Sequence, residues 1–306
     1  MQKTIANTIK LTGKGVHSGK PANLVIHPAS AEYGIWFRRV DVTGKNNLIP
    51  ALYNSVNDTQ MCTSLANEGG VAVSTVEHLM AALAGTGIQN ALIEIDGPEV
   101  PIMDGSAHPF VQAILATGVQ ELDAPVRAIR VLKEVSIRFD ETVATLKPSE
   151  ALEIEFSIEF DDQAIGHQQK HLEMANGAFV RELSDCRTFC QHKDVKALQA
   201  VGLGQGGGLD NAIIVDGGLV MNPEGFRYAD ECVRHKMLDA LGDLALAGAP
   251  ILGKYSGTRA GHRATNMLLR KLFATSGAWE MIVCDTGQTE MLPGAHIQAN
   301  DLRLSV

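Results

Sequence analysis

The chain has 306 residues, of which 45% are hydrophobic and 20% charged, so it can bury a substantial core of about two domains and is not expected to be disordered. Its net charge of −9 argues against non-specific nucleic-acid binding, which needs a basic surface, although local basic residues could still bind an anionic substrate. We find no signal peptide and no apolar run of about 18 residues, and therefore expect no membrane span. The number of cysteines is odd, five, so we expect reduced thiols and a cytoplasmic location.

The first part of the chain alternates strand and turn patterns before its first helix. Short strands are predicted at residues 8–13, 22–28 and 34–40, and His17 falls in a loop between two of them. A helix is predicted over residues 74–85, with Ser74 and Glu77 as a capping box and Gly85 at its end. His78 then lies in the first turn, beside Glu77. A strand at 88–97 and a loop leading into a second helix within 99–118 follow.

A charged connector that contains proline, residues 121–128, marks the predicted boundary between domains 1–124 and 125–306. Beyond it we predict strands within 128–139, 142–148 and 152–160, a helix near 192–201 and a strand at 211–216. Helices at 228–248 and 262–275 and a strand at 279–285 complete the chain. Strands come first and helices later in each half, which indicates an α+β fold of two similar layers, with a diverged duplication as one explanation.

The glycine-rich segment at residues 202–208 formally matches a dinucleotide-binding fingerprint. That fingerprint needs a strand before it and a helix after it, so that phosphate meets a helix N-terminus. Here the order is helix, loop, strand. We therefore predict a mobile or close-packed loop and no dinucleotide site.

The helix at 228–248 has two distinct faces. Apolar residues recur at helical spacing on one face, and Gly248 is the predicted C-cap. The other face carries His235, Asp239 and Asp243, each one turn after the last. An imidazole and a carboxylate at this spacing can bind one metal ion, although a solvated polar face is the commoner meaning of such a pattern.

A metal site becomes a stronger hypothesis when the two histidine-bearing helices are combined. His78, His235 and Asp239 are two imidazoles and one carboxylate, the ligand set of a catalytic zinc site that leaves a position for water. Glu77 is then a candidate base and Asp243 a candidate orienting group. The assembly assumes that helices from different halves meet. The chain has no serine-hydrolase or HExxH motif, and Cys186 and Cys190 are expected to be packing residues.

Five segments, TVEHLMAALAG, EVPIMDGSAHPF, CRTF, RHKMLDALGDL and SGTRAGH, resemble the UDP-3-O-acyl-N-acetylglucosamine deacetylase family, the bacterial zinc enzymes of the committed step of lipid A synthesis. The resemblance covers nearly the whole chain. It implies release of acetate from UDP-3-O-(3-hydroxyacyl)-N-acetylglucosamine. It also implies two α+β domains, each a sheet packed on two helices with an insertion. Zinc would be held by His78, His235 and Asp239, with Fe²⁺ as an alternative in cells.

The resemblance also implies roles for individual residues. Glu77 would be the general base, His262 the charged general acid, Asp243 the group that orients it, and Thr188 a hydroxyl at the oxyanion. Among the implied substrate contacts, Phe160 would lie against uracil, Arg259 at the diphosphate and Lys236 near the sugar or phosphate. Phe189 would contact the substrate beside Thr188. The insertion at about 190–220 would form an acyl tunnel, with Val195, Leu198 and Gly207 in its lining. Polar Gln191 and His192 and the small Gly204 and Gly208 depart from the family pattern and leave the acyl length open.

Three alternatives remain at this point. A non-catalytic sugar-nucleotide-binding protein would not need Glu77 and would release no acetate. A hydroxyacyl thioester dehydratase is fused to this deacetylase in some bacteria, but little sequence follows the second domain here. A structural-metal protein would be expected to supply four ligands, whereas three stand out. We expect the protein to act as a monomer on its nucleotide-sugar substrate, without nucleic acid or a membrane span.

Overall fold

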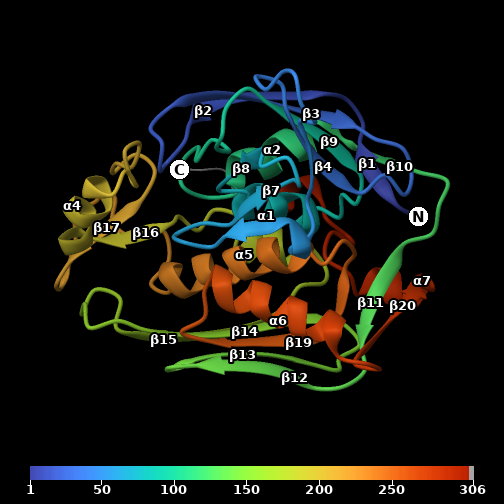
Figure 1. Ribbon diagram of the computed structural model, residues 1–306. Helices are drawn as coiled ribbons and strands as arrows, with labels where there is room; N and C mark the ends of the chain where they lie inside the picture. The colour runs from blue at the N-terminus through green and yellow to red at the C-terminus, as the bar shows by residue number, and fades with distance from the viewer. Residues whose placement is uncertain (303–306) are drawn as a thin grey trace.

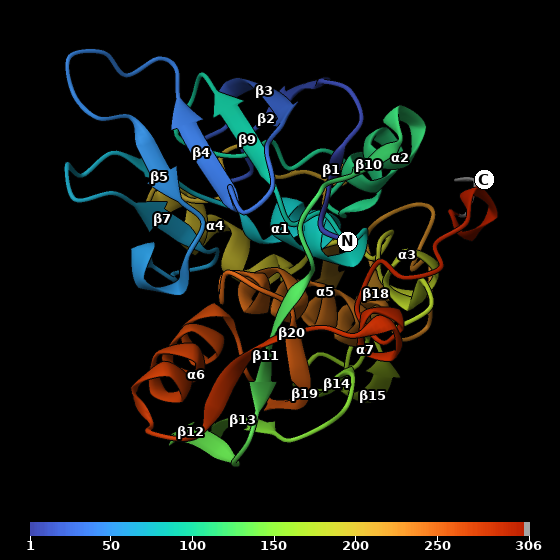
Figure 2. The ribbon, with the colours of Figure 1, turned by 90° about the vertical axis from the view of Figure 1, so that its right-hand side faces the viewer.

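The computed structural model describes residues 1–302, and the chain forms a mixed α+β fold, as predicted. Two large sheets lie on opposite sides of a layer of helices (Figure 1). The central helices are α1 (Glu77–Gly85) and α5 (Glu231–Ala245), which pack directly against each other, with α2 (His108–Thr117) and α6 (His262–Ala274) beside them. The turned view in Figure 2 shows the same arrangement from the side, with α1 above α5.

The upper sheet belongs to the first part of the chain. It has five strands in the order β2-β3-β9-β4-β5, namely β2 (Ile9–Lys14), β3 (Pro21–Pro28), β9 (Ala91–Ile95), β4 (Ile35–Arg39) and β5 (Leu48–Pro50). Its strands alternate buried and exposed residues, as a sheet with one face on the core should, and Leu24 and Ile26 are fully buried. Smaller pieces complete this part: β1 (Lys3–Ile5) paired with β10 (Val119–Glu121), η1 (Tyr53–Ser55), and a three-stranded sheet of β6 (Val56–Asp58), β7 (Ser64–Ala66) and β8 (Ala72–Val73).

The lower sheet has seven strands and belongs to the second part. They are β11 (Arg127–Val131), β12 (Val135–Phe139), β13 (Thr142–Lys147), β14 (Leu152–Glu159), β15 (His167–Glu173), β19 (Ile251–Thr258) and β20 (Trp279–Val283). Strand β19 pairs with β11, β13 and β14, which makes it central to the sheet. The sequence pattern did not predict β19, because its glycines and polar residues interrupt the apolar run.

A smaller lobe projects beside the helices, at the left of Figure 1. It contains β16 (Phe189–Gln191), α4 (His192–Ala200), β17 (Ile213–Asp216) and β18 (Leu219–Val220), and the three strands form their own sheet. The glycine-rich loop between α4 and β17 packs against the loop that contains His17: Gln205 donates its backbone N–H to the His17 carbonyl, and a Cβ on Gly206 would lie 2.2 Å from the Gly15 carbonyl oxygen. The loop is therefore close-packed. Short α3 (Ala178–Glu182), α7 (Thr286–Glu290) and η2 (Ala299–Asp301) lie outside this lobe.

Two predicted helix ends are wrong. Ser74 does not cap α1: its hydroxyl donates to the Pro98 carbonyl, the residue before the helix is Val76, and the Glu77 carboxylate is used elsewhere. Helix α5 ends at Ala245 with Leu246 as its cap, so Gly248 follows the helix without capping it, although its φ of +86° is the left-handed conformation that favours glycine. At Ser74 a tertiary contact replaces the local cap, whereas α5 ends on local hydrogen bonds of Leu246 and Ala247 before Gly248 is reached.

The helices α1 and α5 approach so closely because Gly242 has no side chain. A Cβ at this position would lie 2.0 Å from the carbonyl oxygen of Glu77. The polar face of α5 is consequently buried between the two halves: His235 is 2% exposed, Asp239 5% and Asp243 3%. The alternative of a solvated polar face is wrong, and a buried polar cluster needs partners.

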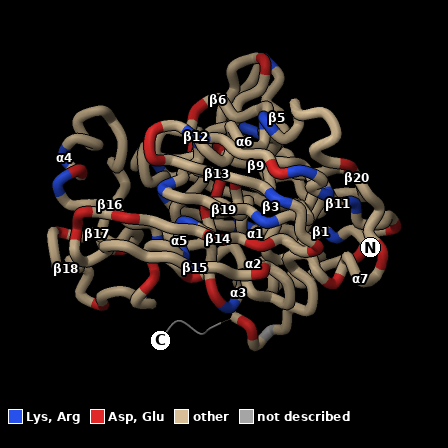
Figure 3. The backbone as a smooth tube through the Cα atoms, turned by 90° about the horizontal axis from the view of Figure 1, so that it is seen from below, with Lys and Arg blue, Asp and Glu red and all other residues tan. Residues whose placement is uncertain are grey.

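Within residues 1–302, none of the helices combines the length and the apolar character that crossing a membrane would take. Figure 3 shows acidic and basic residues interspersed along the backbone. Several of them are paired across strands, for example Lys254 with Glu155 at 2.8 Å and Arg130 with Glu280 at 3.3 Å.

Candidate metal centre and active site

Three potential metal ligands meet where α1 packs on α5. His78 lies in the first turn of α1, and His235 and Asp239 lie one turn apart on α5. One ligand atom from each lies within 4.8 Å of the others, and all three residues are buried. The two imidazole Nε2 atoms lie 3.5 Å (His78) and 3.3 Å (His235) from Asp239 Oδ1. The assumption that helices from different halves meet therefore holds in the structure.

The donor atoms suit a divalent cation. Asp239 Oδ1 is buried and accepts no hydrogen bond from residues 1–302, although two ring nitrogens face it. His235 Nδ1 lies 2.9 Å from the carbonyl oxygen of Cys186, which can only accept, so Nδ1 carries the proton and Nε2 keeps its lone pair. Burial lowers the pKa of His235 to about 4, so this imidazole is neutral near pH 7, as a metal ligand must be.

The other oxygen of Asp239 is held by a lysine. Lys236 Nζ donates to Asp239 Oδ2 at 2.7 Å. Burial alone would raise the pKa of Asp239, but interactions with His235 and Lys236 hold it well below its usual value. The carboxylate is therefore ionised, with Oδ2 occupied and Oδ1 directed at the two imidazoles.

A second row of ionisable groups lies beside the ligand cluster. His262, the first residue of α6, places its Nδ1 2.9 Å from Asp243 Oδ2 and its Nε2 4.0 Å from Glu77 Oε1. Burial alone would lower the pKa of His262, but the charge of Asp243 and its hydrogen bond raise it to about 9. Burial raises the pKa of Glu77, although the charge of the neighbouring His262 acts to lower it. A protonated imidazole and a carboxylate thus face each other next to the ligand set.

Thr63 was missed by sequence reasoning and contacts both carboxylates of this row. Its backbone N–H donates to Glu77 Oε2 at 3.0 Å, and its hydroxyl donates to Asp243 Oδ1 at 2.6 Å. No sequence signal could have identified it, because it stands alone before the short strand β7 and its partner Asp243 is 180 residues away.

Two cavities meet at the ligand cluster. The larger, of about 750 Å³, reaches from Glu77, His78, His235, Asp239 and His262 towards β14 and α6. The smaller, of about 260 Å³, extends beneath the projecting lobe and is mostly apolar. The residues that line both are Met61, Glu77, His78, Thr188, Phe189, Cys190 and Leu198.

The predicted substrate contacts divide between these cavities. Lys236, Phe160 and Arg259 line the larger one; Val195 and Gly207 line the smaller one; and Thr188, Phe189 and Leu198 line both. The rings of Phe160 and Phe189 meet edge to face, with centroids 5.5 Å apart. The polar departures from the family pattern also lie here, Gln191 in the larger cavity and His192 in the smaller. His17, predicted as a loop residue, does lie in a loop but lines the smaller cavity as well.

Arg259 is already engaged by acidic side chains. Its guanidinium pairs with Glu141 and, at 2.7 Å, with Glu159. Its φ of +48° places it in the left-handed region at the end of β19. A phosphate group that binds Arg259 therefore has to compete with two carboxylates.

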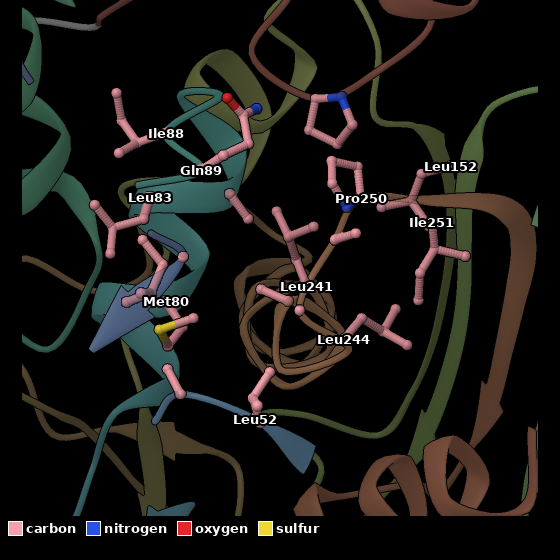
Figure 4. A pocket seen from close by; sticks show the side chains of 18 residues that line it. Leu52, Met80, Leu83, Ile88, Gln89, Leu152, Leu241, Leu244, Pro250 and Ile251 are labelled. Carbon is pink, nitrogen blue, oxygen red and sulfur yellow. The ribbon is translucent and has the colours of Figure 1, made fainter. Parts of the chain in front are cut away.

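A third cavity, of about 100 Å³, lies between α1 and α5 away from the ligand cluster. Figure 4 shows Met80 and Leu83 from α1 facing Leu241 and Leu244 from α5 across it. None of its lining residues is ionisable, and apolar side chains dominate its wall. Among the described residues, this cavity therefore offers no side chain that could transfer a proton, unlike the two cavities at the ligand cluster.

Comparison with known proteins gives one consistent result. A family model described as UDP-3-O-acyl N-acetylglycosamine deacetylase matches residues 2–274. A UDP-3-O-acyl-N-acetylglucosamine deacetylase of Phenylobacterium zucineum is 47% identical over 92% of this chain and 96% of its own length. A deacetylase of the same name from Shewanella frigidimarina is 42% identical over 96% of this chain and 98% of its own length. One from Haemophilus influenzae is 44% identical over 97% of each chain.

Proposed function

The chain belongs to the UDP-3-O-acyl-N-acetylglucosamine deacetylase family, and we propose on this premise that it hydrolyses the N-acetyl group of UDP-3-O-(3-hydroxyacyl)-N-acetylglucosamine in lipid A biosynthesis. The observation that carries the proposal is the ligand cluster of His78, His235 and Asp239, placed beside Glu77 and His262 at the junction of two cavities. A hydrolase needs a base, an acid and a place for the substrate, and this junction offers all three.

The metal is proposed to be Zn²⁺, held by His78 Nε2, His235 Nε2 and an oxygen of Asp239. Two imidazoles and one carboxylate form the ligand set of a catalytic zinc site, and Fe²⁺ is the alternative that accepts the same ligands. When bound, the ion lowers the pKa of water towards about 7 and polarises the acetyl carbonyl. Lys236 supports the site by holding Asp239 Oδ2 and leaving Oδ1 for the ion.

The protein's own groups then move the protons. Glu77 accepts one proton from the attacking water as the new C–O bond forms. His262, kept cationic by Asp243, donates one proton to the amide nitrogen as the C–N bond breaks, so the products are acetate and the free 2-amine. Thr188 lines both cavities and is proposed to donate its hydroxyl to the developing oxyanion.

The substrate is proposed to span the two cavities. The UDP-sugar would occupy the larger one, with Lys236 near the sugar or phosphate, Phe160 against the uracil and Arg259 at the diphosphate. The acyl chain would occupy the smaller one, against Phe189, Val195, Leu198 and Gly207.

We further propose that the chain has two domains, residues 1–124 and 125–306, and that it acts as a monomer. We also propose a cytoplasmic location, because five cysteines without a disulfide are typical of a reducing compartment.

Acetate release from the acylated nucleotide sugar tests the proposed function directly. We expect turnover by the purified protein, loss of at least about 90% of it after treatment with a chelator, and recovery when Zn²⁺ is restored, because the metal supplies the activated water. Acetate is measured by a coupled assay and metal content by elemental analysis. Tight binding of the substrate without acetate release by the metal-loaded protein would identify a sugar-nucleotide-binding protein instead.

The acyl cavity is tested by replacing Leu198 with glutamine. Burying a leucine side chain stabilises by about 1.5–3 kcal/mol, so we expect kcat/KM for a long-chain substrate to fall about tenfold. A substrate analogue without the acyl chain should be affected less than about twofold. The matched control is Leu219→Gln, in the same lobe but 71% exposed and outside both cavity walls, which should leave both substrates unchanged. Equal losses for both substrates in Leu198→Gln would argue against the acyl cavity.

A further inference from the structure

We propose that Thr63 is a positioning residue that fixes the base and the acid of the reaction relative to each other; this inference rests on the proposed function. Thr63 contacts both carboxylates of the second row of ionisable groups, Glu77 on α1 and Asp243 on α5. Thr63 itself is 1% exposed and lies in neither cavity wall, so it acts through these carboxylates and does not touch the substrate.

Thr63 uses each of its polar groups. Its N–H donates to Glu77 Oε2 at 3.0 Å, its hydroxyl donates to Asp243 Oδ1 at 2.6 Å, and its carbonyl accepts the N–H of Val76, the residue before α1, at 3.3 Å. Hydrogen bonds to carboxylates are the stronger kind and hold a side chain in one rotamer. Thr63 therefore ties the start of α1, its first carboxylate and the middle of α5 together.

The contacts of Thr63 leave the opposite oxygen of each carboxylate for His262. Asp243 Oδ2 accepts from His262 Nδ1 at 2.9 Å, and Glu77 Oε1 lies 4.0 Å from His262 Nε2. If the hydroxyl of Thr63 is lost, Asp243 keeps His262 but can rotate, because its second oxygen is no longer held. The imidazole would then be misaligned with the scissile nitrogen, and misplacement of reacting groups costs rate more than binding.

A purely structural role would give a different result. A buried threonine hydroxyl that only satisfies a buried acceptor contributes stability, and its removal lowers the melting temperature without changing turnover. Thr86 is such a residue: it is 2% exposed, its hydroxyl donates to the Ala82 carbonyl at 2.7 Å, and it contacts neither carboxylate. Thr86→Val is therefore the matched control.

The test compares Thr63→Val, Thr63→Ser and Thr86→Val as metal-loaded full chains. Valine keeps the shape and the backbone N–H to Glu77 but loses the hydroxyl. We expect kcat to fall about 10–100-fold, because misplacing a reacting group by about 1 Å can cost about 10²-fold in rate, with KM within about twofold and metal content unchanged. Thr63→Ser should recover kcat to within about threefold of the parent, and Thr86→Val should keep it while lowering the melting temperature.

A double-mutant cycle separates positioning from general damage. In a His262→Gln background, Thr63→Val should change kcat by less than about twofold, because Thr63 acts through His262. Full additivity of the two losses, or a parent-like kcat in metal-loaded Thr63→Val, would overturn the proposal. If Thr63→Val does not fold, Thr63→Cys, a weaker donor of similar size, should lower kcat at least about threefold, and a parent-like kcat there would count equally against it. Acetate release by the parent in the same assay tests the proposed function separately.

Discussion

Replacing Glu77 by glutamine is expected to lower kcat by about 10²–10⁴ while the protein keeps its metal, because general base catalysis is worth that range. Glutamine keeps the size of the side chain and can still accept the backbone N–H of Thr63, so the local structure should survive. Only the ability to take a proton is removed. Glu77 is 3% exposed and its Oε1 lies 4.0 Å from His262 Nε2, so the substitution acts directly beside the proposed acid.

Steady-state acetate release and metal analysis of the same Glu77→Gln samples check this expectation. The control is Glu68→Gln, an exposed glutamate in the same half of the chain, which should turn over like the parent. A kcat within about threefold of the parent in metal-loaded Glu77→Gln would refute the role of Glu77 as base. Loss of metal would show instead that the carboxylate mainly supports the ligand cluster.

Replacing His78 by alanine is expected to remove the metal itself. His78 is the only member of the cluster that α1 supplies, so its loss leaves two ligands on α5, His235 and Asp239. Removal of an outer partner of a metal site already lowers affinity about 10–100-fold, and removal of a direct ligand should exceed that. Activity should fall at least in proportion to the metal lost.

Elemental analysis after dialysis against a weak chelator measures the effect of His78→Ala. His108→Ala provides a matched control, because His108 is also a buried histidine in the first turn of a helix, α2, but lies outside the cluster. That control should keep one metal per chain even if its stability falls. Parent-like metal content in His78→Ala would mean that the ion is bound elsewhere.

The sequence predicted the elements that have strong local patterns. The amphipathic helices α5 and α6, and the strands β2 to β4, were expected because their apolar residues repeat at the spacing of each element. The His235-to-Asp239 spacing also placed two proposed metal ligands on one helix face. The α+β class followed from the order of strands and helices and is confirmed by the structure.

The remaining features depend on contacts between distant segments. Strand β19 is central because three other strands pair with it, and its own residues, with glycines at 253 and 257, carry no strand signal. The predicted capping box does not form, because the Glu77 carboxylate accepts the backbone N–H of Thr63 and the Ser74 hydroxyl donates to the Pro98 carbonyl. Thr63 itself stands alone in the chain, and its role depends on Asp243, which only the packing of α1 on α5 brings near.

The close approach at Gly242 has a wider consequence. A methyl group there would lie 2.0 Å from the Glu77 carbonyl oxygen, whereas ordinary van der Waals contact begins at 3.4 Å, so the two helices would have to separate. Metal ligation tolerates deviations of only about 0.2 Å. The absence of a side chain at Gly242 thus lets the proposed ligand from α1 and the two from α5 lie close enough to share one ion. Loss-of-function changes in this enzyme should therefore include a residue that has no reactive group at all.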